Sequence, residues 1–152
     1  LLLAGAAIPA AAQPAGVARP IPKAGEWALA DDLPPARGCA ALLHGDNVDV
    51  NLLQTNDGHM LLVASRPDWQ FNPGPAKFRF QVDAGPQTPI EGDLMANLLL
   101  TPVDAELEAA LSKAKSVTWH LPDGGAYHAQ IEGLKTAFAA LKACNIRKGV
   151  AR

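Results

Sequence analysis

The strongest constraint on the fold is a pair of apolar runs that flank a tight-turn sequence. In the first run, residues 48–52, apolar and polar side chains alternate as Val-Asp-Val-Asn-Leu, the two-residue period of a half-buried strand. The second run, residues 60–63, comes after Asn56-Asp57-Gly58, and Gly58 accepts the positive φ angle that a tight turn requires. Residues 48–63 therefore predict an antiparallel β-hairpin.

Six further segments have the composition of short strands. Residues 78–82 alternate as cleanly as residues 48–52, and a second hairpin is expected around Asp123-Gly124-Gly125. The strands of this hairpin and the remaining three candidates are residues 116–121, 126–131, 26–29, 39–43 and the apolar run 94–100.

Two helices are expected in the second half of the chain. Thr101 as N-cap, Pro102 at the first helical position and Asp104 in the first turn mark the start of the first helix. The second helix runs from Leu134 to about Cys144, with its large apolar side chains on one stripe. Seven or eight short strands with two late helices predict an α+β fold, in which helices cover one side of an antiparallel β-sheet or β-sandwich.

The start of the chain has the features of an export signal. Residues 1–8 form an uncharged apolar run, too short for a bilayer, which needs about 20 residues. Small residues follow, and we expect a signal peptide over 1–12, lacking its basic n-region and cleaved after Ala12. The alternative is a flexible Ala/Pro-rich tail. Beyond it we expect a Pro/Ala-rich linker over 13–25, a single globular domain over 26–146 and a tail over 147–152, in a periplasmic or secreted protein.

Charge and hydropathy narrow the classes of partner. The 13 Lys and Arg residues nearly balance the 15 Asp and Glu residues, and no basic cluster is present that would neutralise several phosphates. We therefore expect no nucleic-acid partner. No further segment approaches 18 apolar residues, so no transmembrane segment is expected in the mature chain.

The two cysteines, Cys39 and Cys144, lie near the two ends of the expected domain. In an oxidising compartment a disulfide between them is the default expectation. Closing a loop of about 100 residues stabilises a fold by up to about 4.7 kcal/mol in the chain-entropy model. The alternative is a pair of free thiols, although neither cysteine lies in a C-x-x-C motif.

The second hairpin carries the sharpest candidate for chemistry. A three-residue loop over 123–125 would set Trp119 opposite Ala129 and His120 opposite His128. Two imidazoles so placed are able to share a zinc or copper ion. We expect instead that both histidines lie on a solvated polar face and that the protein has no cofactor, because no Cys or nearby carboxylate completes the metal shell; a zinc or copper site at His120 and His128 is the alternative.

Evidence for catalysis is weaker still. His44-Gly45-Asp46 with Asp49 contains a base and a carboxylate, but the same residues form an ordinary polar loop. No G-x-S-x-G motif surrounds any serine, and no H-E-x-x-H motif is present. We therefore expect no catalytic residues, with a small hydrolase as the weaker alternative.

One segment combines large aromatic residues with loop composition. Trp69 and Phe71 lie within residues 67–75, which also contain three prolines. Large apolar side chains in a loop are either anchors packed on the core or a recognition surface. Residues 67–75 are the leading candidate surface for binding a partner.

The closing stretch, residues 127–141, runs Tyr-His-Ala-Gln-Ile-Glu-Gly-Leu-Lys-Thr-Ala-Phe-Ala-Ala-Leu. It resembles the final strand and helix of the invasion-associated locus B proteins of alphaproteobacteria. The resemblance covers about the last fifth of the chain, and the cysteine pattern usual in that family is not found elsewhere in it. It implies a β-rich periplasmic or envelope-associated protein without an established enzymatic activity, and it transfers no functional residues. Together these features predict an exported, non-catalytic binding or envelope-associated protein whose partner is another protein or the cell envelope.

Overall fold

The structure is a computed structural model that describes residues 27–30, 39–55 and 57–148. The expected signal peptide and linker, residues 1–25, lie outside the described residues. One antiparallel sheet with the strand order β1-β2-β3-β4-β7-β6-β5-β8-β9 forms the body of the domain, with two helices, mostly in the second half of the chain. The elements are β1 (Trp27–Ala30), β2 (Ala40–Leu43), β3 (Asp49–Gln54), β4 (Met60–Ser65), β5 (Phe71–Val82), β6 (Gln87–Ala96), β7 (Leu98–Val103), α2 (Ala105–Lys113), β8 (Ser116–His120), β9 (Ala126–Gln130) and α3 (Leu134–Lys148).

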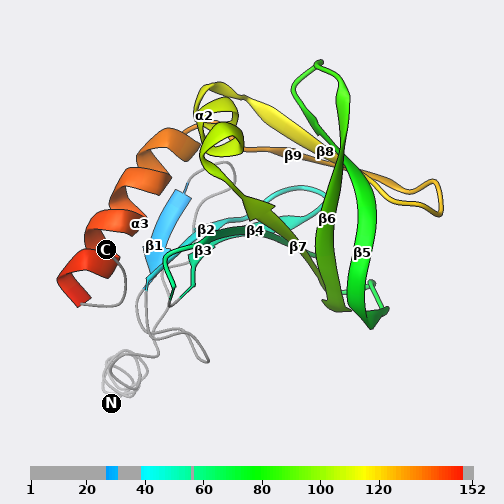
Figure 1. Cartoon of the computed structure of the whole chain (residues 1–152), viewed down its shortest axis with the longest axis horizontal. Helices are drawn as coiled ribbons and strands as arrows, with labels where there is room; N and C mark the ends of the chain where they lie inside the picture. The colour runs from blue at the N-terminus through cyan, green and yellow to red at the C-terminus, as the bar shows by residue number, and fades with distance from the viewer. Residues whose placement is uncertain (1–26, 31–38, 56, 149–152) are drawn as a thin grey trace, which may run out of the picture.

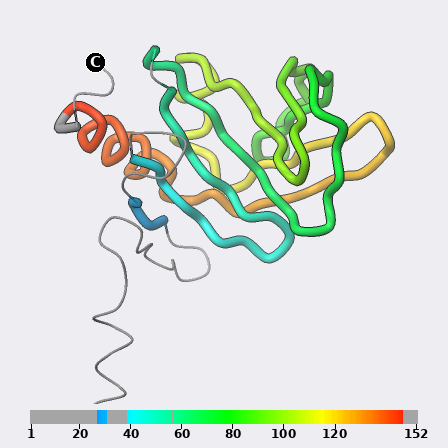
Figure 2. The backbone as a smooth tube through the Cα atoms, turned by 90° about the horizontal axis from the view of Figure 1, so that it is seen from below, coloured from blue at the N-terminus to red at the C-terminus, as the bar shows by residue number. Residues whose placement is uncertain are grey.

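The sheet is folded over on itself. Strands β2, β3, β4 and β7 form one layer, the long β5–β6 hairpin stands at one end, and β8 and β9 run back over the first layer (Figure 1). Figure 2 shows α3 at one end of the molecule and the turn between β8 and β9 at the other. Among the described residues no helix is long and apolar enough to cross a membrane.

The core lies between the two layers of the folded sheet. Alternate residues of each strand face inward, and the largest fully buried side chain is Trp119 of β8, which packs against Phe80 of β5 with 5.5 Å between ring centroids. The indole Nε1 of Trp119 donates a hydrogen bond of 3.0 Å to Oγ1 of Thr101 in β7. Both residues are completely buried, so each satisfies the polar group of the other.

The predicted disulfide is confirmed: Cys39 and Cys144 are bonded, with 6.1 Å between their Cα atoms. The next residue, Asn145, is completely buried and reinforces the junction. Its Oδ1 accepts a hydrogen bond from the Cys39 N–H at 2.7 Å, and its Nδ2 donates to Oε1 of Gln54 at 2.9 Å. Helix α3 is therefore tied to Cys39, the residue before β2, by the disulfide and a hydrogen bond, and to Gln54 of β3 by a second hydrogen bond.

The predicted start of the first helix was wrong. Thr101 and Pro102 belong to β7, and Asp104 is the N-cap, its carboxylate accepting from the Leu107 N–H at 2.8 Å. Thr101 is needed in the sheet because its hydroxyl pairs with the buried indole of Trp119. Pairing between β6 and β7 ends at Leu100. On that side of β7, Pro102 has no β6 residue to pair with, so its missing N–H is tolerated.

The prediction of a single strand over 94–100 was also wrong, because these residues belong to two strands, β6 and β7. The backbone of Ala96 is left-handed, with φ at 54°, and it separates β6 from β7. Sequence reasoning missed most of β6 because Pro89 and Gly92 are typical of loops. Gly92 is required here, since a Cβ atom would lie 2.2 Å from the carbonyl oxygen of Leu100 and 2.9 Å from the Phe78 ring.

Asp83 fixes the end of β5 against the start of β8. Its Oδ1 accepts hydrogen bonds from the backbone N–H groups of Lys115 at 2.9 Å and Ser116 at 3.0 Å. These two donors hold the pKa of the Asp83 carboxyl below its usual range. The residue is left-handed, with φ at 50°, a conformation that Asp tolerates better than most side chains.

Removing the disulfide should cost substantial stability. We expect the double substitution Cys39→Ala and Cys144→Ala to lower the free energy of unfolding by roughly 2–4 kcal/mol, because the unfolded chain loses a constraint that spans 105 residues. Urea denaturation monitored by tryptophan fluorescence measures this difference. Oxidised and reduced wild-type protein provide the matched comparison, and a loss below about 1 kcal/mol would contradict the expectation.

The contribution of Asp83 should depend on pH. Because its pKa is lowered in the folded state, the carboxylate stabilises the fold above the pKa of the unfolded chain, and this stability is lost as the pH falls through the folded pKa. Asp83→Asn keeps the shape and an acceptor oxygen but removes the charge. The wild-type thermal midpoint should exceed that of Asp83→Asn at pH 7, and the two should converge below about pH 4. If the thermal midpoints of the two proteins differ by the same amount at pH 7 and pH 3, the ionised Asp83 carboxylate is not the source of the stability.

Candidate functional site

The predicted partner-binding aromatics do not form an open surface. Trp69 is only 6 % exposed, and its ring packs against Phe71 at 5.0 Å and edge-on against Tyr127 of β9 at 4.9 Å between centroids. Phe71 is partly buried and begins β5, so residues 71–75 belong to a strand and are not a loop. Trp69 therefore packs as a core residue. Partner binding through Trp69 and Phe71 remains a prediction.

Arg66, in the connection between β4 and β5, also packs on Tyr127. The Arg66 guanidinium lies over the Tyr127 ring, 5.1 Å from the centroid, and donates to both carboxylate oxygens of Asp68 at 2.8 and 2.9 Å. This pairing lowers the pKa of Asp68 and raises that of Arg66. Arg66 also donates to the carbonyl oxygen of Asn47 at 3.0 Å. The connection between β4 and β5 thus joins the turn before β3 to edge strand β9.

The predicted register of the second hairpin was wrong by two residues. The structure pairs His120 with Ala126 and His128 with Thr118. Pairing stops at Leu121 because the next residue is proline, which has no N–H to donate, and Gly124 supplies the positive φ at 93°. The hairpin loop therefore begins one residue earlier than expected.

The two histidines consequently have separate partners on the same outer face. Nε2 of His120 lies 2.9 Å from Oε1 of Gln81 on β5, and Nδ1 of His128 lies 3.2 Å from Oγ1 of Thr118. The described residues contain no group of three or more His, Cys, Asp or Glu side chains that could hold a metal ion. The His120/His128 metal site stays a prediction without a completed ligand shell.

His44 and Asp49 do form a pair, with 2.6 Å between Nδ1 and Oδ1. In the strand register it is Asp49, and not His44, that lies opposite Ser65 of β4. In a serine hydrolase the imidazole must stand between the serine and the carboxylate. The arrangement of these three residues is therefore not that of a catalytic triad.

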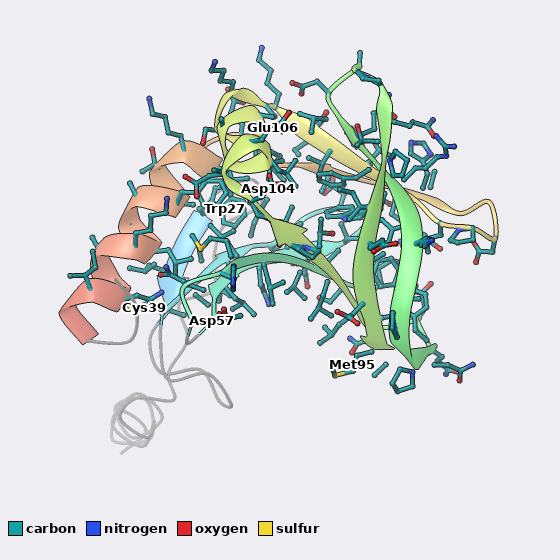
Figure 3. All side chains as sticks on the ribbon, in the orientation of Figure 1. Trp27, Cys39, Asp57, Met95, Asp104 and Glu106 are labelled. Atoms are coloured by element: carbon teal, nitrogen blue, oxygen red, sulfur yellow. A yellow bond between two sulfur atoms is a disulfide. The ribbon has the colours of Figure 1, made fainter. Side chains whose placement is uncertain are left out.

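The outer face of the sheet over β2, β3, β4 and β7 is rich in apolar side chains, although Asp49, Asn51 and Ser65 also lie on it. The strand register places side chains on this face that point away from the core, most of them partly exposed. Met95, at the adjoining end of β6, is 49 % exposed and points away from the fold (Figure 3). The apolar outer face consists of Leu42, Leu53, Leu61, Val63, Met95, Leu98 and Leu100.

The same outer face becomes polar and basic beyond β6. Strand alternation turns the aromatic side chains of β5 and β8 inward, and their polar neighbours outward. The outward residues of β5, β8 and β9 are Lys77, Arg79, Gln81, Thr118, His120, His128 and Gln130. One continuous sheet thus presents two surfaces of different chemistry.

Sequence reasoning missed the apolar outer face, although a signal for it is present. Residues 60–64 and 98–100 are continuous apolar runs, and such runs are typical of strands covered on both faces. Helices α2 and α3 supply Leu111, Leu134 and Phe138 to the inner core, so they cover the inner face. Within the described part of the chain no helix covers the outer face.

Comparison with known proteins supports the fold. No family model and no curated protein matches the sequence. The crystal structure of invasion associated protein B from Bartonella henselae is similar, with a TM-score of 0.58 and 18 % sequence identity over 80 % of this chain and 94 % of that chain. At this identity the similarity establishes a shared fold, and it is consistent with the resemblance noted in residues 127–141.

Trp69 should behave as a core residue. We expect Trp69→Ala to lower the free energy of unfolding by about 3–5 kcal/mol, because it removes an aromatic ring from a packed cluster. The neighbouring exposed residue provides a control, and Gln70→Ala should change the value by less than about 0.5 kcal/mol. Urea denaturation measures both. Equal, small effects of the two substitutions would show that the ring is dispensable for folding.

Proposed function

We propose that this protein is an exported, non-catalytic binding protein of the cell envelope, which recognises a partner protein through its apolar outer face. The observation that carries the proposal is the composition of that face. Six Leu and Val side chains from four adjacent strands, together with Met95, point away from the core. Contiguous apolar surface of this kind is typical of an interaction site.

The size of the face favours a transient complex. Strands lie about 4.8 Å apart, so five strands with their outward side chains span roughly 20 by 20 Å, or about 400 Å². This is about half of the roughly 800 Å² that one partner contributes to a stable interface. A permanent dimer would need more surface than the face provides.

The chemistry of the face defines the partner. Among the described residues the charged groups lie at its edges, where His44 pairs with Asp49 and Asp93 lies opposite Leu100. One uncharged polar residue, Asn51, lies within the face between Leu42 and Val63. A flat apolar sheet packs best against another apolar sheet or helix face, with about 10 Å between stacked sheets. We therefore propose that the partner is a protein that presents such an apolar sheet or helix face.

Export is supported by the disulfide and by the apolar leader sequence. Disulfides persist in oxidising compartments such as the periplasm and are rare in the cytosol. The structural neighbour is named for an association with invasion, which is compatible with an envelope location.

Site-specific photo-crosslinking in cells that export the protein tests the proposal. A benzophenone amino acid at position 61, in the apolar outer face, should crosslink to one protein species, whereas the same group at position 118, on the polar half, should not. Leu98→Lys should reduce the position 61 product about tenfold or more, because its direct strand neighbours, Met95 and Ser65, carry no charge and an unpaired ammonium group would be buried in the contact.

The controls separate a binding defect from a folding defect. Leu98→Lys must retain the circular dichroism spectrum and disulfide of the wild-type chain. Equal products from positions 61 and 118 would contradict the proposal. If the crosslinked products contain only lipid, or only a second copy of this chain, that molecule and not a partner protein binds the apolar outer face.

A further inference from the structure

The polar half of the outer face contains a groove that the proposed function does not use. The groove has a volume of about 530 Å³. It lies at the end of the sheet formed by β6, β5 and β8, beyond the apolar outer face. Its lining, here called the basic groove, consists of Lys77, Phe78, Arg79, Gln87, Pro89, His120, Leu121 and Pro122.

Strand alternation and register build this groove. In residues 77–81 the aromatics face the core, so Lys77 and Arg79 project together from the outer side of β5. The register sets Arg79 directly between Pro89 of β6 and His120 of β8. Neither neighbour offers a carboxylate to the guanidinium.

The charge of the groove is positive. No Asp or Glu lies among its lining residues, and Arg79 is exposed and makes no ion pair with any described residue. Lys77 has a neighbour in Glu91 at 3.5 Å, but both side chains are at least 80 % exposed, so the pair is weak. Asp123, in the adjoining turn, directs its carboxylate to the backbone N–H of Gly125 at 2.8 Å.

The imidazole of His120, which lines the groove, is held in place by a neighbouring glutamine. Nε2 of His120 lies 2.9 Å from Oε1 of Gln81, and Nε2 of Gln81 donates to the carbonyl oxygen of Gly85 at 3.0 Å. This chain of contacts fixes the imidazole beside Arg79. The groove therefore combines an unpaired guanidinium, an ammonium group and an oriented imidazole.

We infer that the basic groove binds a phosphate group carried by a small polar headgroup. A guanidinium presents a fork of N–H donors that matches phosphate oxygens, and a lysine adds a mobile positive charge. The volume of the groove lies within the range of roughly 300–1,000 Å³ of small-molecule sites, large enough for a headgroup beyond the phosphate itself. The site is separate from the apolar outer face and does not depend on the partner proposed for it.

Titration of the isotope-labelled full chain with glycerol 3-phosphate tests the assignment. Saturable shifts of backbone amide signals are expected at Arg79 and His120, weakening as salt is added because the groove is open to solvent. Arg79→Gln should weaken the affinity about tenfold, the effect of one lost charge-assisted hydrogen bond. Lys113→Gln removes an exposed positive charge outside the groove and should leave the affinity unchanged.

A second arm distinguishes a free phosphate from a lipid headgroup. Cosedimentation with vesicles of phosphatidylglycerol in phosphatidylcholine, compared with phosphatidylcholine alone, reports binding to the lipid. Binding to glycerol 3-phosphate, or binding to the phosphatidylglycerol vesicles without binding to glycerol 3-phosphate, supports the site if Arg79→Gln weakens that binding and Lys113→Gln does not. If the protein binds neither ligand, or if the two substitutions have equal effects, the proposed site is wrong. Because Arg79 is exposed, an unchanged thermal midpoint in Arg79→Gln is the check on folding.

Discussion

The hydrogen bond between Trp119 and Thr101 is the contact on which the folded-over sheet depends. It joins β8 of one layer to β7 of the other through two completely buried side chains. A buried indole N–H without an acceptor costs about 1–3 kcal/mol, and the hydroxyl of Thr101 removes this cost for Trp119. The same requirement explains why residue 101 lies in a strand although it has the character of a helix cap.

Two further contacts close the space around this core. At one side, the disulfide between Cys39 and Cys144 and the buried Asn145 hold α3 against β2 and β3. At the other, Arg66 and Trp69 pack on Tyr127 and join the β4–β5 connection to β9. These contacts hold the large inward side chains in the core.

That outer surface is divided by β6 into an apolar and a basic half. The chemistry of each strand is local, since β4 and β7 contain continuous apolar runs whereas β5, β8 and β9 alternate polar with apolar residues, and the sheet order groups these strands into two halves. An apolar face suits contact with another protein surface, and unpaired Arg79 suits an anion. The two halves have separate chemistry, so the protein has room to hold a partner and a small anionic ligand at once.

The sequence by itself determined the strands with clear alternation, the existence of both hairpins, the two late helices and the disulfide, because these depend on local periodicity, turn residues and compartment. Only the tertiary structure decided the role of Thr101, the existence of most of β6 and the burial of Trp69, since each depends on a residue distant in the chain. The register of the second hairpin was a local property that was misjudged, because Pro122 ends the pairing one residue before the expected loop. The two chemical halves of the outer surface were decided by sheet order, which places β4, β7, β6, β5 and β8 side by side although no short stretch of sequence records that order.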